Sequence, residues 1–393
     1  MKNIAIIDVI GLTYDGDTLK KRGLGGSESA VILMSKELVK LGFNVTVFNN
    51  CIDKESSEGV FDGVNYVDLK RLHEPYDSKF DIVISSRTII PFLQERYWTH
   101  FEHNPHIFSQ LKKNARLKIV WMHDTFCMGD HLLEEHVVNG DIDELFTLSD
   151  FHMTYVSNCD HGNRRNYEVL KNKIFLTRNG AVQHVKNVDI SKKDPNLFVY
   201  NASVTKGMIP LVEEIWPRIK QFIPEAKLKI VGGFYRFREE HGPDEQENKF
   251  WDLYKRPDNT ELNIEFTGII RQDEIAQILA NASYFIFPGA FPETFGISSV
   301  EALLHNTPLL TCRFGAVEET GLELASYFIN YAIEPNGLFP NINKSDQINN
   351  FVDMVVRAYR TPYLHQQKMY RSEEHTSELQ SHLNLVCRLL LEK

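Results

Sequence analysis

The sequence predicts an α/β fold built from two doubly wound, Rossmann-like domains that face each other across a cleft. The chain has 393 residues, which is more than one hydrophobic core usually supports, so two domains are expected. Short apolar stretches alternate with helical stretches in both halves, as in parallel sheets covered by helices on both faces. A polar segment separates the halves. We therefore predict a first domain over residues 1–185, a linker over 186–196 and a second domain over 197–370.

The first half begins with a β-α-β unit. A buried strand is predicted over residues 3–9, a helix over 28–41 that is closed by Gly42, and a second strand over 44–48. Further strands of this half are predicted at residues 81–85, 118–122, 152–156 and 174–177.

The second half shows the same alternation. A strand over residues 197–200 precedes a helix over 209–222, and Pro210 in the first turn suits a helix start. Later elements are strands at 227–231, 263–267, 284–287 and 308–311, and helices around 274–279 and after Gly296. Ligands of such sheets bind beyond the carboxyl ends of the strands, so functional residues are expected in the loops there.

Composition limits the classes of function. The formal net charge of -10 disfavours a nucleic-acid-binding protein, which needs a broad basic surface. The five cysteines are scattered and form no C-x-x-C pair, so neither a disulfide framework nor a zinc site is predicted, and a reducing cytoplasm fits best. No apolar run approaches the length that spans a membrane.

The most informative segment is 288–308, which follows the apolar stretch 284–287. A loop with Gly and Pro leads into helical spacing, so a helix is predicted to begin near Gly296. The free N–H groups and positive dipole end of such a helix suit a diphosphate, and a glycine lets an anion approach the backbone. Carboxylates in the phosphate pocket would repel this ligand. Glu293 and Glu301, which flank the helix start, are therefore expected to accept hydrogen bonds from sugar hydroxyls.

This segment resembles the E-x7-E signature of GT-B glycosyltransferases of the family 4 type, in which a Pro-Glu-x-Phe-Gly loop leads into a Glu-Ala helix. The matching residues are Pro292, Glu293, Phe295, Gly296, Glu301, Ala302 and Pro308. The resemblance implies that Glu293 contacts the donor sugar and Glu301 the nucleotide ribose, with Phe295, Gly296 and Ile297 also at the donor. An ordinary loop-helix junction with solvated Glu residues is the alternative.

A second loop, at residues 24–30, opens the first predicted helix, with Ser27 placed to cap it. It resembles the Gly-Gly-Ser-Glu loop that related enzymes carry near the donor phosphates and the acceptor. The resemblance implies a donor-binding role for Gly25 and Gly26 and suggests one for Glu28. A simple capped turn would explain the same residues.

Other candidates stand at predicted strand ends. His123 and Asp124 follow a predicted strand, and the resemblance implies a His near the donor sugar at this position. Asn179 and Gly180 resemble the Asn-Gly pair that closes the first domain of the family, although a turn would also explain them.

A cation is expected at the start of the second domain. Lys206 follows a predicted strand and would neutralise the diphosphate as charge builds on it. Related enzymes place an Arg five residues earlier, whereas this chain has Asn201. Arg236 and Arg271 are the possible substitutes.

Three segments toward the end of the chain complete the candidates. Glu318 and Glu319 resemble a family Gly-x-x-Glu motif, and residues 336–338 resemble its Asn-Gly-Leu turn, although both could be structural. Residues 371–393 resemble a translated sequencing adapter, so we predict a non-native tail there.

The resemblance implies a retaining glycosyltransferase of the hexosyltransferase class, with His123, Lys206 and Glu293 as catalytic residues. It would move a sugar from a nucleotide diphosphate sugar to a hydroxyl of a glycan, a lipid-linked molecule or another small acceptor. No cofactor is predicted, and no metal, because no Asp-x-Asp is suitably placed. We expect a cytoplasmic location, with peripheral membrane contact left open. The alternatives are a GT-B-fold nucleotide-sugar epimerase and a non-catalytic nucleotide-sugar-binding protein.

Overall fold

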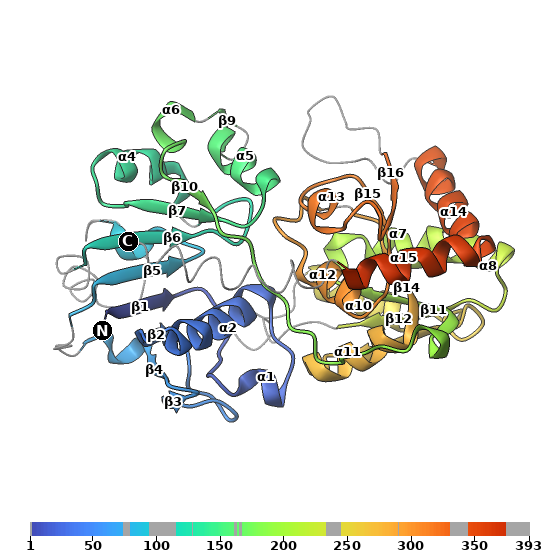
Figure 1. Cartoon of the computed structure of the whole chain (residues 1–393), viewed down its shortest axis with the longest axis horizontal. Coiled ribbons are helices and arrows are strands. Elements are labelled where there is room, and N and C mark those ends of the chain that lie inside the picture. Colours follow the sequence, from blue (N-terminus) through green and yellow to red (C-terminus); the bar gives the residue numbers. More distant parts are fainter. Residues whose placement is uncertain are drawn as a thin grey trace. The chain divides into compact units, whose positions relative to one another are not determined.

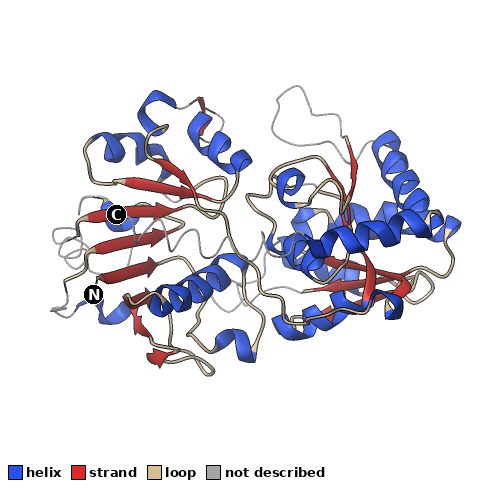
Figure 2. Cartoon of the chain, in the orientation of Figure 1, coloured by secondary structure: helices blue, strands red, loops and turns tan. Residues whose placement is uncertain are grey.

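The computed structural model describes residues 2–73, 79–93, 115–127, 129–160, 163–164, 167–232, 245–289, 291–330 and 345–374. The chain divides into two compact units, unit 1 running to Gly180 and unit 2 beginning at Ala181. Each contains one large, mostly parallel sheet with helices between its strands (Figure 1, Figure 2). The predicted α/β fold with two doubly wound, Rossmann-like domains is confirmed. None of the helices in the described ranges is long and apolar enough to cross a membrane.

The sheet of unit 1 has the strand order β10-β7-β6-β5-β1-β2-β4-β3, and β3 is its antiparallel edge strand. Its strands are β1 (Asn3–Asp8), β2 (Asn44–Asn49), β3 (Gly59–Phe61), β4 (Val64–Asp68), β5 (Ile82–Ser86), β6 (Leu117–Trp121), β7 (Glu144–Thr147) and β10 (Ile174–Leu176). A separate hairpin consists of β8 (Cys159–Asp160) and β9 (Asn163–Arg164). The α-helices are α1 (Thr18–Lys21), α2 (Gly26–Lys40), α4 (Leu133–Val138), α5 (Asp150–Asn158) and α6 (Tyr167–Leu170), and the 3-10 helices are η1 (Leu69–His73), η2 (Ile90–Phe92) and η4 (Asp130–Leu132).

One predicted strand of unit 1 is wrong. Residues 152–156 lie within α5, and the neighbouring strand is β7, which we did not predict. The Ser149 hydroxyl accepts a hydrogen bond from the backbone N–H of His152 at 2.9 Å, as a helix cap does. His152, Val156 and Ser157 are buried, and this spacing belongs to a helix face rather than to a strand.

Unit 2 has a six-stranded parallel sheet in the order β13-β12-β11-β14-β15-β16. The strands are β11 (Asp194–Asn201), β12 (Lys227–Val231), β13 (Ile264–Gly268), β14 (Ala282–Phe287), β15 (Leu309–Cys312) and β16 (Tyr327–Ile329). The helices are α7 (Met208–Pro210), a π-helical turn (Leu211–Ile215), α8 (Trp216–Phe222), α10 (Glu245–Tyr254), α11 (Gln272–Asn281), α12 (Ile297–Leu304), α13 (Val317–Thr320), α14 (Ser345–Arg360) and α15 (Pro362–Glu374), with 3-10 turns η5 (Ile190–Lys192) and η6 (Val204–Lys206).

The segment that we expected to be a linker, residues 186–196, groups with unit 2 and contains the start of β11. The Lys193 ammonium is buried and donates hydrogen bonds to the carbonyls of Leu279 and Ala282 and to the Thr307 hydroxyl. The polar composition of this segment therefore partly reflects a buried, hydrogen-bonded charge. Sequence composition alone does not distinguish such a charge from a solvated one.

The predicted non-native tail begins inside a helix of the structure. α15 continues through Glu374, and Ser372 is fully buried, with its hydroxyl donating to the carbonyl of Lys368 at 3.1 Å. Residues 375–393 lie outside the described residues. The foreign origin of the tail stays a prediction.

Candidate functional site

The strand order of unit 2 fixes where a ligand would bind. The first strand, β11, has β12 on one side and β14 on the other, so the direction in which the sheet grows reverses between β11 and β14. Open α/β sheets bind ligands beyond the carboxyl ends of the strands at such a switch point. The loops after Asn201 and Phe287, where these strands end, therefore frame the candidate site.

These two loops bring Lys206 and Glu293 together. The Lys206 ammonium lies 2.6 Å from Oε1 of Glu293 and 4.8 Å from the centre of the Phe291 ring. Lys206 ends η6, and Gly207 then turns the chain into α7 with a φ of +113°, a conformation that residues with a Cβ rarely adopt. Two of the three residues predicted to be catalytic thus form one ion pair at the switch point.

The loop that carries Glu293 is held by the segment after β15. The backbone N–H of Ala316 donates to the Glu293 carbonyl at 2.8 Å, and the Thr320 hydroxyl donates to the Phe295 carbonyl at 2.8 Å. A Cβ on Gly315 would lie 2.8 Å from the Glu293 nitrogen and 2.9 Å from its carbonyl oxygen. Only glycine permits this close approach, so Gly315 helps to place Glu293.

α12 starts beside this loop as predicted. Gly296 has a φ of +78° and precedes the first helical residue, Ile297, while Phe295 is buried. Glu301 lies one turn further along and is partly exposed. Burial of its carboxyl group raises the pKa to about 7. Within the described ranges no residue donates a hydrogen bond to this carboxylate, which leaves its oxygens available to a ligand.

Those of the other candidate residues for which the structure gives an ion pair are bound to neighbouring side chains. Arg271 precedes α11, where its guanidinium pairs with Asp273 at 2.9 Å. Arg236 and residues 336–338 lie outside the described residues. Glu318 and Glu319 belong to α13, and Glu318 lies 3.5 Å from Arg313.

Unit 1 has its own switch point between β1 and β5, and a buried ion cluster occupies it. One guanidinium nitrogen of Arg87 lies 3.0 Å from Asp8 and 3.0 Å from Glu28. The Tyr14 hydroxyl donates to Asp8 at 3.0 Å, and the Leu12 N–H donates to Glu28 at 3.1 Å. The sequence analysis missed Arg87, although an Arg directly after an apolar strand was a visible signal.

This cluster gives one glycine of the loop a structural role, and donor binding by Gly25 and Gly26 stays a prediction. A Cβ on Gly25 would lie 2.3 Å from the Glu28 carboxylate, so a larger residue there would push the Glu28 side chain out of this position. Gly25 also precedes the first residue of α2, Gly26. Ser27 is therefore inside the helix and does not cap it, which corrects the predicted cap.

His123 lies next to this cluster along the sheet, after β6. It is 5% exposed, and its ring centre is 4.3 Å from that of Trp121. Burial lowers the pKa of His123 well below its ordinary range, and the charges of Arg87 and His152 act in the same direction. The imidazole is neutral at neutral pH. Asp124 contributes its carbonyl, which accepts a hydrogen bond from His152 Nε2 at 2.9 Å. Asn179 is buried, and Gly180 is the last residue of unit 1 before the chain enters unit 2.

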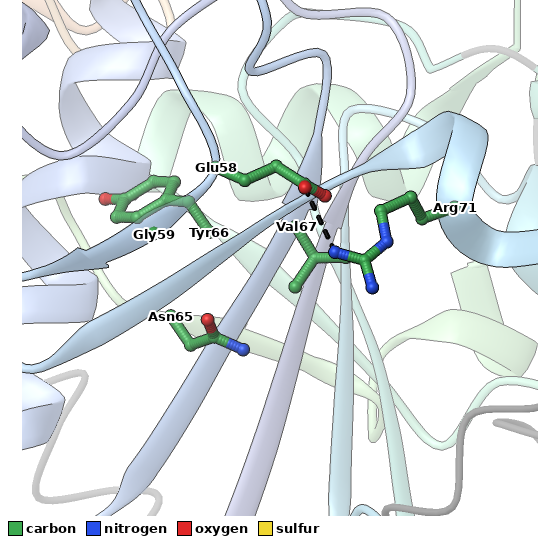
Figure 3. Close-up of a pocket in the computed structure, with 6 residues that line it drawn as sticks. All are labelled: Glu58, Gly59, Asn65, Tyr66, Val67 and Arg71. Carbon is green, nitrogen blue, oxygen red and sulfur yellow. Dashed lines mark hydrogen bonds and ion pairs between the residues drawn. The ribbon is translucent and has the colours of Figure 1, made fainter.

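A pocket also lies at the β3–β4 edge of unit 1 (Figure 3). Its lining includes Glu58, Asn65 and Arg71, and the Glu58 carboxylate pairs with the Arg71 guanidinium at 3.0 Å. None of the predicted site residues lines it. Across the described ranges, no group of three or more His, Cys, Asp or Glu side chains could hold a metal ion.

Known proteins share this architecture. Residues 196–331, which contain Lys206, Glu293 and Glu301, match the model of a family described as Glycosyl transferases group 1. Sucrose-phosphate synthase from Thermosynechococcus elongatus superposes with a TM-score of 0.71 at 14% identity, covering 100% of this chain and 99% of that one. The chain has the GT-B fold.

Two further structures agree with this fold. HepE from Anabaena, in complex with UDP and glucose, gives a TM-score of 0.62 at 14% identity and covers 100% of both chains. WaaG, a glycosyltransferase involved in lipopolysaccharide biosynthesis, gives 0.58 at 12% identity and covers 98% of this chain and 99% of its own. No curated protein sequence matches the chain.

Proposed function

We propose that this protein is a glycosyltransferase that moves a sugar from a nucleotide diphosphate sugar to an acceptor hydroxyl with retention of anomeric configuration. The observation that carries the proposal is the Lys206–Glu293 pair, 2.6 Å apart, at the switch point of unit 2. It stands beside the glycine-led start of α12, where backbone N–H groups suit an anion. The match of this region to group 1 glycosyltransferases supports the same function.

The residues divide the donor between them. Lys206 and the α12 amides would stabilise the departing diphosphate, because charge develops there in the transition state. Glu293 would orient the sugar. Glu301, whose carboxylate has no donor among the residues that the structure describes, would accept hydrogen bonds from the ribose hydroxyls. Retention would follow from front-face attack by the acceptor hydroxyl, since no carboxylate is assigned as a nucleophile.

Unit 1 would contribute to sugar transfer through a neutral group. A neutral His123 can donate or accept a hydrogen bond without attracting the diphosphate. Cys51 and Cys312 are buried free thiols, which suits the cytoplasmic location that we propose. A hexosyl donor, and an acceptor that is a glycan or a lipid-linked molecule, belong to the same proposal.

A thermal-shift screen of UDP-, GDP- and ADP-sugars tests the function, because a ligand that binds only the folded state raises the melting temperature by mass action. The donor that stabilises the protein is then incubated with and without acceptors, with Lys206→Met as the matched inactive variant. Transfer to an acceptor, lost in Lys206→Met, supports the proposal. Conversion of the donor sugar without an acceptor would instead indicate an epimerase, and binding without any turnover a binding protein.

A further inference from the structure

The two central residues of the proposed donor site are engaged with each other. The Lys206 ammonium and the Glu293 carboxylate are 2.6 Å apart, yet the proposed roles need the ammonium on the diphosphate and the carboxylate on the sugar. No other acceptor contacts this ammonium within the residues that the structure describes. A donor that enters the site therefore meets a cation that is already neutralised.

The exposure of the two side chains and an aromatic contact indicate that Glu293, and not Lys206, would move. The Lys206 side chain is 29% exposed and that of Glu293 is 12% exposed, so the ammonium is the more accessible of the two. The Phe291 ring, 4.8 Å from the ammonium, attracts it through its π face. An incoming anion can thus reach Lys206 while the ring holds the ammonium in place.

We propose that the donor diphosphate displaces Glu293 from Lys206, so that binding of the diphosphate frees the Glu293 carboxylate to engage the sugar. This inference rests on the proposed function. A partly exposed ion pair between one ammonium and one carboxylate is weak. A diphosphate carries more negative charge than the Glu293 carboxylate and also accepts hydrogen bonds from the α12 amides, so it displaces that carboxylate. The site then offers its sugar-binding carboxylate only after the diphosphate has bound.

The exchange predicts a gain in affinity, whereas the loss of a binding-site residue ordinarily lowers affinity. Removing the charge of Glu293 should tighten the binding of a free nucleoside diphosphate, because the ligand no longer competes for Lys206. Isothermal titration calorimetry with UDP, GDP and ADP, in separate titrations without sugar, measures this. Glu293→Gln should bind the cognate diphosphate about threefold to tenfold more tightly than wild type.

Two further variants isolate the cause. Glu265→Gln removes the same charge from a carboxylate that pairs with Lys229 at 3.1 Å on β13, and its affinity should equal that of wild type. In a Lys206→Met background, Glu293→Gln should gain much less affinity, since no ammonium is left to release. Thermal melts of every variant confirm that each is folded.

The outcomes separate this inference from the proposed function. Tighter binding by Glu293→Gln that depends on Lys206 supports the exchange. Unchanged or weaker binding by Glu293→Gln overturns the exchange while the proposed function stands, as does an equal gain in the Lys206→Met background, which would indicate simple charge repulsion. If wild type binds none of the three diphosphates, the proposed function fails and the exchange fails with it.

Discussion

Gly315→Ala is the substitution whose effect the structure defines most sharply. The new Cβ would lie 2.8 Å from the Glu293 nitrogen, whereas ordinary contacts begin near 3.4 Å, so the loop that carries Glu293 must move by roughly 0.5 Å. A displacement of about 1 Å at a reacting group can cost about a hundredfold in rate. We therefore expect the turnover of the nucleotide sugar to fall about tenfold.

The substitution also strains the backbone, and a matched control separates this effect. Gly315 has a φ of +68° and Gly140 has a φ of +74°, but a Cβ on Gly140 meets nothing within 4 Å. Each alanine should cost about 1–2 kcal/mol of stability through its backbone conformation. Only Gly315→Ala should lower turnover, measured by release of the nucleoside diphosphate at a temperature where both variants are folded. Equal turnover in the two variants would refute the idea that Gly315 places Glu293.

Four other predictions follow. Glu301→Ala should weaken nucleoside diphosphate binding by about 1.5–3 kcal/mol in calorimetry if the carboxylate accepts a charged hydrogen bond. Burial raises the pKa of the Glu301 carboxyl from an ordinary value of 4.5 to about 7. Its contribution to folding stability is therefore full below pH 4.5 and is lost as the pH rises through about 7. Glu301→Gln should flatten the plot of melting temperature against pH over this range. Burial lowers the pKa of Lys193 from 10.5 to about 7. Its contribution to folding stability is therefore full above pH 10.5 and is lost as the pH falls through about 7. Wild type should show this dependence of melting temperature on pH, and Lys193→Met should not. Truncation after Glu374 should leave the melting temperature unchanged if the tail is foreign, and a clear drop would show that residues 375–393 form part of the fold.

The sequence predicts the parts of the fold that depend on local pattern. The buried strands β1, β2 and β12 are apolar runs between turn residues, and the start of α12 is marked by Gly296, so all four are found within a residue or two. The strand predicted at 152–156 fails because alternating apolar residues in a short window fit a helix as well, and the cap at Ser149 decides for the helix.

The sequence indicates site residues where a local motif or a resemblance marks them. Glu293, Gly296 and Glu301 stand in one segment, so their association is visible in the sequence. Arg87 and Gly315 act through residues far away in the chain, at Asp8 and Glu293 respectively. Long-range contacts of this kind have no local pattern. Their discovery depends on the strand order, which places the ends of β1 and β5, and of β14 and β15, side by side.

The two switch points differ in charge, and this difference supports the assignment of the donor to unit 2. In unit 1 the Arg87 guanidinium, 13% exposed, is shared by two carboxylates whose side chains are almost fully buried, so the described cluster pairs one cation with two acidic side chains. A diphosphate would be repelled there and would have to break a buried pair, which is strongly unfavourable. In unit 2 a single, partly exposed ammonium faces a single carboxylate beside the amino end of α12. The diphosphate can break that weak ion pair. The freed Lys206 ammonium is then available to hold the diphosphate. The acceptor hydroxyl carries no such charge, so the cluster of unit 1 would not exclude it.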